Sequence, residues 1–208
     1  PPPPPPPPPS LPPPPPPHTP TPQHSSAASD VYKRQVLLIR ENIICWPFGI
    51  AGSLLSIYLF IDGKLYSEAF LYSYYVFMGV WGWMRWSQRN ATHDNPVIRY
   101  DFSSHAVIIL VSGAGALALG SFFSFYTDAQ RPYIDAFTTA FSFAATYMEV
   151  KKVLETWYYW IVLNLASIWL YMDRSLDIYA ALICVYAVMS VWGLVQWSRV
   201  YRGQRGVS

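Results

Sequence analysis

The chain has 208 residues and a formal net charge of +2; charged residues make up 12% of it and aromatic residues 17%. A soluble domain needs a charged surface and has about twice this charged fraction, and so small a net charge does not indicate a nucleic-acid partner. Both cysteines, Cys45 and Cys184, fall in apolar stretches, so they predict neither a disulfide framework nor a metal site, and no enzyme class is favoured.

Residues 1–35 are expected to form a disordered, Pro-rich segment that carries no function. The homopolymeric prolines in it can adopt only polyproline II or disordered conformations. Residues 25–35 show no apolar period and resemble translated adapter sequence. We interpret the segment either as a natural Pro-rich tail or as an artefact. No apolar stretch lies near its start, so no secretory signal is expected.

Six stretches are apolar enough to predict transmembrane helices. A bilayer core of about 30 Å is crossed by about 20 apolar residues in a helix. The fourth stretch is rich in Thr, Ser and Ala, which predicts a helix packed inside the bundle rather than against lipid. The predicted spans are 43–61, 69–84, 106–126, 136–148, 156–172 and 178–195, and a cytoplasmic tail is expected at 201–208.

The basic residues between these spans predict their orientation. Of the 14 Lys and Arg residues, only Lys64, Arg131 and Arg174 fall on one side, and the others fall on the side that holds the C-terminus. Loops rich in Lys and Arg remain in the cytoplasm. The C-terminus is therefore predicted to be cytoplasmic.

An internal repeat relates the first pair of spans to the last pair. A shift of 111 residues places Asp62 on Asp173 and Trp86 on Trp197. The other matches are Leu65 with Leu176, Ala69 with Ala180, Tyr75 with Tyr186, Met78 with Met189, Trp81–Gly82 with Trp192–Gly193 and, after a gap of three residues, Glu41 with Glu155 and Trp46 with Trp160.

The repeat also predicts a missing helix. Corresponding spans run the same way through the membrane, and such parallel repeats are related by an axis along the membrane normal, with the substrate between them. The helix before span five has no full counterpart before span one, where residues 36–39 form only an apolar stub. We expect an all-α membrane helix bundle over 36–200. Two parallel three-helix repeats (36–86 and 133–197) surround a linker helix (105–126), and the first helix is largely missing.

The second repeat carries a pattern of the form D-A-x-T-T, then K-x-x-E-x-W-x-x-W-x-x-x-N. Its residues are Asp135, Ala136, Thr138, Thr139, Lys152, Glu155, Trp157, Trp160 and Asn164. With these motifs and the sequence around Cys45–Trp46–Pro47, the chain resembles the PnuC-type nicotinamide riboside (nicotinamide mononucleotide) transporters. The resemblance covers about residues 36–200 and implies a fold similar to the SWEET sugar transporters.

One face of the predicted helix at 156–172 carries two indoles, an amide and a hydroxyl, from Trp157, Trp160, Asn164 and Ser167. The plainer interpretation is an interfacial Trp belt with an Asn that bonds a neighbouring helix. Against it, an indole suits a flat and especially a cationic ring, and an amide can pair with a carboxamide or ribose hydroxyl. The resemblance implies that Trp157, Trp160 and Asn164 bind substrate, and the expected set also includes Thr138, Trp46 and Tyr72.

The resemblance implies uptake of nicotinamide riboside, for NAD biosynthesis, through the bacterial inner membrane. No ionisable residue is expected at mid-span and no nucleotide-binding loop is present, which favours facilitated diffusion by rocking of the repeats. Thr156 in place of Asn and Tyr72 in place of Gln leave thiamine, riboflavin and deoxynucleosides as alternatives. A non-transporting membrane fragment or sensor is the alternative of another class. The expected partners are the small aromatic substrate and the bilayer, with a homo-oligomer left open; no enzyme activity, cofactor or metal is expected.

Overall fold

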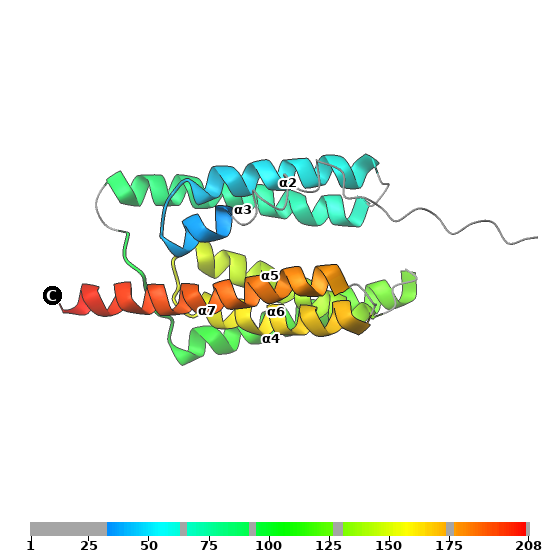
Figure 1. Cartoon of the computed structure of the whole chain (residues 1–208). Coiled ribbons are helices and arrows are strands. Elements are labelled where there is room, and N and C mark those ends of the chain that lie inside the picture. The colour runs from blue at the N-terminus through cyan, green and yellow to red at the C-terminus, as the bar shows by residue number, and fades with distance from the viewer. Residues whose placement is uncertain (1–32, 63–65, 92–94, 127–130, 174–176, 207–208) are drawn as a thin grey trace, which may run out of the picture.

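The protein is an all-α, polytopic membrane helix bundle (Figure 1). Its structure, a computed structural model, describes residues 33–62, 66–91, 95–126, 131–173 and 177–206. A short helical stretch at 33–39 comes first. The longer helices are α2 (Cys45–Asp62), α3 (Tyr66–Ala91), α4 (Phe102–Tyr126), α5 (Pro132–Val150), α6 (Thr156–Asp173) and α7 (Asp177–Arg205). The shortest of these has 18 residues, or about 27 Å at 1.5 Å per residue, which is close to the thickness of a bilayer core.

Each of the six predicted spans is a helix, but two extend well beyond their predicted ends. Helix α3 continues to Ala91 and α7 to Arg205, so most of the predicted tail at 201–208 is helical. Hydropathy detects only the apolar part of a helix, whereas the polar, basic turns that follow keep their backbone hydrogen bonds outside the bilayer. Among the described residues, only Phe102–Tyr126 and Ala180–Arg205 are both long and apolar enough to be recognised as spans by composition alone.

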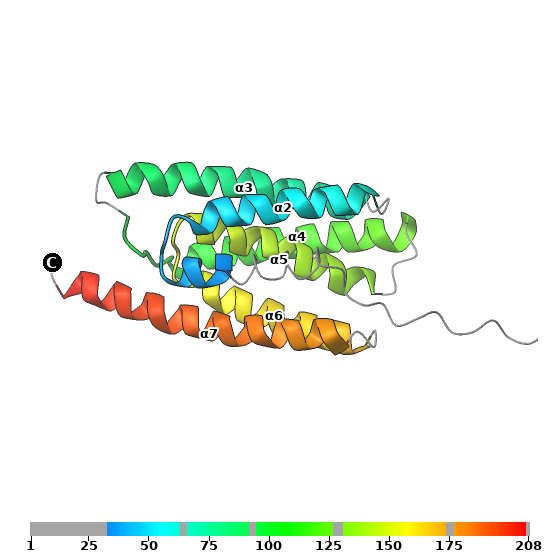
Figure 2. The ribbon, with the colours of Figure 1, turned by 45° about the horizontal axis from the view of Figure 1, so that its top comes forward.

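The helices pack as three pairs, α2 with α3, α4 with α5, and α6 with α7 (Figure 2). Helix α5 joins the pairs, because it also contacts α6 and α3. Its small residues Ala136, Ala140 and Ala145 are buried, which confirms that the fourth span packs inside the bundle. Helices α3, α5 and α7 end at the same end of the bundle (Figure 1), and the last turns of α3 and α7 carry Arg89, Arg202 and Arg205.

Each repeat is built around a pair of perpendicular tryptophans. Trp46 meets Trp86 with ring centroids 5.4 Å apart and planes at 86°, and Trp157 meets Trp197 at 5.3 Å and 89°. All four indoles are buried. A Cβ added to Gly82 would lie 2.6 Å from the Trp46 ring, and Gly193 lies equally tightly against Trp157. Glycine at these two positions therefore lets the indole lie directly on the backbone of the neighbouring helix.

This geometry corrects the predicted alignment of the repeats upstream of α2. Trp46 corresponds to Trp157 and not to Trp160, so the shift of 111 residues continues without a gap. The turn before each tryptophan has the same hydrogen bonds: Glu41 N donates to Leu38 O at 2.9 Å, and Lys152 N donates to Glu149 O at 3.0 Å. Glu41 thus corresponds to Lys152, and its match with Glu155 was wrong. The gapped alignment matches identical residues, because Glu155 and Trp160 each lie three residues after the true equivalents of Glu41 and Trp46.

The helical stretch 33–39 corresponds to the last turns of α5. The Asn42 N donates to Leu37 O at 2.8 Å, as Val153 N donates to Met148 O at 2.9 Å. Residues 33–35, which the sequence assigned to the Pro-rich segment, are helical here, so the boundary expected at residue 36 lies inside the helix. Polar residues hid this turn from an analysis of apolar periodicity. The rest of that segment, residues 1–32, lies outside the described residues.

An ion pair joins the two repeats at equivalent positions. Glu41 and Lys152 both have left-handed backbone conformations, with φ of 55° and 56°. The Lys152 Nζ lies 2.7 Å from Glu41 Oε2, donates to the Asn95 carbonyl oxygen at 3.1 Å and lies 4.6 Å from the centroid of the Trp86 ring. The Trp86 Nε1 in turn donates to Val150 O at 3.0 Å. Buried polar contacts therefore connect repeat one to repeat two at the end of the bundle where α3, α5 and α7 end.

Gly193→Ala is expected to lower the free energy of unfolding by about 1–3 kcal/mol, because the new methyl group displaces the rigid Trp157 ring in a filled core. Thermal unfolding of purified protein in detergent measures the loss. Gly113→Ala is the matched control, since a Cβ at Gly113 meets no atom within 4 Å. Equal melting temperatures for the two variants would contradict this account of the core.

Glu41→Gln is expected to destabilise the protein by about 3 kcal/mol, because it leaves the buried Lys152 ammonium without its counter-charge. Adding Lys152→Met removes the uncompensated charge and should recover most of this loss. A double-mutant cycle by chemical unfolding measures the coupling. Losses that simply add would show that the two side chains are energetically independent.

Candidate functional site

A polar cavity of about 380 Å³ lies between the two repeats. Residues of the helical stretch 33–39 and of α3 line one side of it, and residues of α5, α6 and α7 line the other. A second cavity of about 190 Å³ adjoins it, because both are lined by Arg34, Tyr72, Tyr75 and Trp160. The walls combine aromatic rings with hydroxyl and amide groups, the mixture that orients a flat polar ligand.

Helix α6 supplies the central part of the wall. Trp160, Asn164, Ser167 and Tyr171 recur every three or four residues and all line the larger cavity. The Asn164 Nδ2 donates to Ser190 Oγ at 3.0 Å, and Ser190 Oγ donates to Tyr186 O at 2.8 Å. This chain of bonds from α7 fixes the amide plane of Asn164 in the wall. The predicted Trp160 and Asn164 are therefore brought together at one cavity.

Tyr72 and Thr138, also predicted, face the same cavity from opposite sides. Tyr72 and Tyr75 lie edge to face, with centroids 5.6 Å apart and planes at 87°. The Thr138 Oγ1 donates to the carbonyls of its own helix, 3.1 Å from Ile134 O and 3.0 Å from Asp135 O. The hydroxyl keeps acceptor capacity for a ligand while its proton is used locally.

The two remaining predicted residues have different environments. Trp46 lines the smaller cavity with part of its ring, although it is almost fully buried. Trp157 is completely buried between Gly193 and Trp197 and is not among the described residues that line either cavity. Its position favours a packing role over the predicted substrate contact. Because Trp157 and Trp160 are three residues apart, they lie about 60° apart around the helix, which is enough to separate core from cavity.

A buried charged pair behind Trp160 escaped prediction. The Trp160 Nε1 donates to Glu149 Oε2 at 3.2 Å, and an Arg34 guanidinium nitrogen donates to Glu149 Oε1. Glu149 is 1% exposed. The sequence placed Glu149 at a span end and Arg34 in a segment set aside, so neither was considered for the site. When the repeats are aligned without a gap, Glu149 corresponds to the apolar Leu38. The acidic residue at an otherwise apolar position is the signal in the sequence that could have revealed this pair.

Comparisons with known proteins decide the family. The profile of the family described as nicotinamide mononucleotide transporter matches residues 34–199, most of the chain. The chain belongs to this family. It is 20% identical over 162 residues to the riboflavin/roseoflavin transporter RibM of Streptomyces davaonensis, with 76% of each protein covered. The crystal structure of the vitamin B3 transporter PnuC superposes with a TM-score of 0.70 at 19% identity, covering 86% of this chain and 82% of that one.

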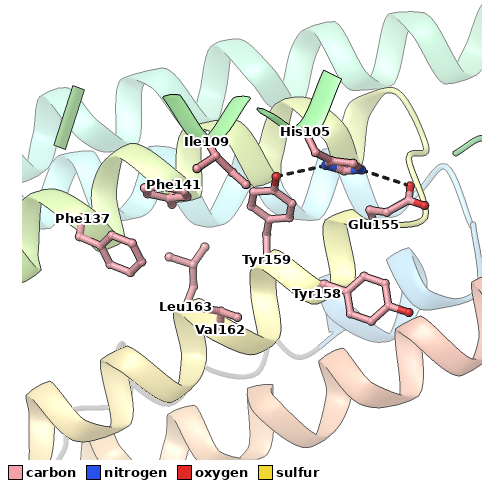
Figure 3. Close-up of a pocket in the computed structure, with 9 residues that line it drawn as sticks. All are labelled: His105, Ile109, Phe137, Phe141, Glu155, Tyr158, Tyr159, Val162 and Leu163. Carbon is pink, nitrogen blue, oxygen red and sulfur yellow. Dashed lines mark hydrogen bonds and ion pairs between the residues drawn. The ribbon is translucent and has the colours of Figure 1, made fainter. Parts of the chain in front are cut away.

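This member of the nicotinamide mononucleotide transporter family also has an apolar pocket on its side. The pocket, about 430 Å³, lies between α4, α5 and α6 and is lined by Phe137, Phe141, Val162 and other apolar residues (Figure 3). One end of the pocket is polar and is formed by His105, Tyr159 and Glu155. Since Tyr158 and Val162 on its rim are about half exposed on the outer face of α6, the pocket faces lipid. The cavity between the repeats is the better candidate for a polar substrate.

The polar residues at this end of the pocket connect the start of α4 to the start of α6. The His105 Nδ1 lies 3.1 Å from Tyr159 Oη, and Arg99 Nε donates to Glu155 Oε1 at 2.6 Å. This hydrogen bond and the carboxylate charge raise the pKa of Arg99, which therefore stays positive. The family-motif residue Glu155 thus holds the loop before α4 against the start of α6. Within the described part of the chain, no group of three His, Cys, Asp or Glu residues could hold a metal.

Proposed function

We propose that this protein carries a vitamin or vitamin precursor with a flat heteroaromatic ring across the membrane. The observation that supports it best is the cavity between the repeats, in which Trp160, Asn164 and Tyr72 combine stacking surface with fixed hydrogen-bonding groups. Family membership supports the same class of cargo, because one relative is a riboflavin/roseoflavin transporter and a protein of similar fold is a vitamin B3 transporter.

Nicotinamide riboside is the first candidate substrate. Its pyridinium ring suits the face of Trp160, and its carboxamide and ribose hydroxyls match the amide of Asn164 and the hydroxyls that line the cavity. Riboflavin is the second candidate, supported by the likeness to the RibM transporter. Its flavin ring is larger and neutral, so it would use stacking and hydrogen bonds without a charge contribution. Thiamine and deoxynucleosides complete the set of cargoes to compare.

Rocking of one repeat against the other accounts for transport. The larger cavity is lined by the early turns of α3 and α7 and by α6 from Trp160 to Tyr171, so it extends toward the end where α3 and α7 begin. At the other end, the Glu41–Lys152 ion pair holds the repeats together. In the proposed orientation this closed, basic end faces the cytoplasm of a bacterial cell, with the protein in the inner membrane. The cavity would then be the outward-facing one.

Trp160→Ala and Asn164→Ala are each expected to weaken binding of the preferred vitamin by at least about tenfold, the effect of losing about 1.4 kcal/mol. The reasons are a lost stacking surface in the first case and a lost amide in the second. Calorimetry with nicotinamide riboside, thiamine and riboflavin on purified protein measures both.

Trp169→Ala is the matched control, because Trp169 lies on the same helix but is 52% exposed on its outer face. Binding should remain unchanged in this variant. If Trp160→Ala bound every ligand as the unmodified protein does, the proposed site would be wrong.

Uptake into proteoliposomes is expected to stop when internal and external concentrations of the vitamin are equal. The physical reason is that no carboxylate of a described residue lines either cavity, and Glu149 behind their wall is paired with the Arg34 guanidinium. Radiolabelled uptake with and without an imposed proton gradient measures the end point. Accumulation above the external concentration in response to the gradient would exclude facilitated diffusion.

A further inference from the structure

Glu149 is a carboxylate buried where the fold does not require one. Its equivalent in repeat one is Leu38, and both side chains are almost fully buried. The same packing position is therefore filled by an apolar side chain in one repeat and by an acid in the other. A buried carboxylate is costly without partners, and an ionisable residue inside a membrane bundle usually serves a substrate or ion pathway.

The carboxylate lies directly behind the wall of the two cavities. Both of its partners, Arg34 and Trp160, line both cavities, and each of them bonds a different oxygen of Glu149. Trp160 is also the stacking residue of the proposed function. The anionic group and the aromatic face are thus joined by one hydrogen bond.

Arg34 shows what kind of group fits beside this carboxylate. Among the described residues that line the two cavities, it is the only charged one. Its guanidinium is a flat, delocalised cation that suits a carboxylate, and it shares the Glu149 carboxylate with the Trp160 indole N–H. The side chain passes tightly over Gly49, where an added Cβ would lie 2.8 Å from Arg34 Nε.

We propose that Glu149 selects flat cationic rings as substrates, and that Arg34 occupies the place of the cation until the substrate displaces it. This inference rests on the proposed function and names its substrate class. A pyridinium or thiazolium ring carries a delocalised positive charge in a plane, as the guanidinium does. Exchange of one cation for another leaves the buried charge balanced, whereas a neutral ring cannot replace Arg34.

The competing explanation is that the pair only ties the repeats together, since Arg34 belongs to repeat one and Glu149 to repeat two. The two explanations differ for ligands of equal shape and different charge. Nicotinamide riboside and its reduced dihydro form are such a pair, because they have the same size and groups but only the first is a cation. Riboflavin is a second neutral probe.

Glu149→Gln tests the charge, because glutamine keeps the volume and an oxygen that can accept the bond from Trp160 Nε1. We expect binding of nicotinamide riboside to weaken about tenfold or more, the effect of one lost charge contact. Binding of the reduced form and of riboflavin should change less than about twofold. The full-length protein in lipid nanodiscs is used for calorimetry, and melting temperatures report folding.

Arg34→Gln gives a result in the opposite direction and remains informative if Glu149→Gln does not fold. Removal of the resident cation should make nicotinamide riboside bind about tenfold more tightly, while neutral ligands bind as before. A purely structural tie predicts instead a lower melting temperature and an equal loss for all ligands. The inference is overturned if Arg34→Gln weakens the binding of all ligands equally. It is also overturned if the ratio between the affinities for cationic and neutral ligands stays unchanged.

The unmodified protein separates this inference from the proposed function. Binding of riboflavin without binding of any cationic vitamin would leave vitamin transport standing and overturn the role of Glu149. Binding of no vitamin at all would overturn both. Cationic vitamins that bind at least as well as their neutral counterparts, with the two variant effects above, are the expected result.

Discussion

The packing of an indole on a glycine determines the architecture of both repeats. Trp46 on Gly82 and Trp157 on Gly193 let neighbouring helices approach until ring and backbone touch. Membrane helices have no hydrophobic driving force between them, because lipid is as apolar as their side chains, so close contact of this kind provides their attraction. The second tryptophan of each pair, Trp86 or Trp197, completes the core of its repeat.

Different residues of α6 contribute to the core of repeat two and to the wall of the cavity. Trp157 belongs to the core of the repeat, and Trp160, three residues later, belongs to the cavity. Asn164 continues the cavity face and is fixed by Ser190 from α7. One helix therefore joins the rigid core to the candidate binding surface, so a disturbance at Gly193 would be expected to reach Trp160 through a single turn of helix.

Much of this could be predicted from the sequence, because the spans and the repeat depend on local composition. Apolar stretches identified the six long helices, Trp160 and Asn164 lie on the predicted face of α6, and Thr138 and Tyr72 were in the expected binding set. The sequence could not separate Trp157 from Trp160, since both lie on one broad face and only the approach of α7 distinguishes them. Arg34 and Glu149 were missed because their meaning depends on a contact between residues 115 positions apart.

The ion pair between Glu41 and Lys152 has a consequence for how the repeats recognise each other. These residues occupy equivalent positions in the two halves, yet they carry opposite charges. Two copies of repeat one placed around the same axis would bring two carboxylates together, and two copies of repeat two would bring together two ammonium groups. Like charges at this buried position are costly, so each half rejects a copy of itself and accepts only the other. A single pair of side chains thereby makes an almost symmetric molecule depend on the difference between its halves.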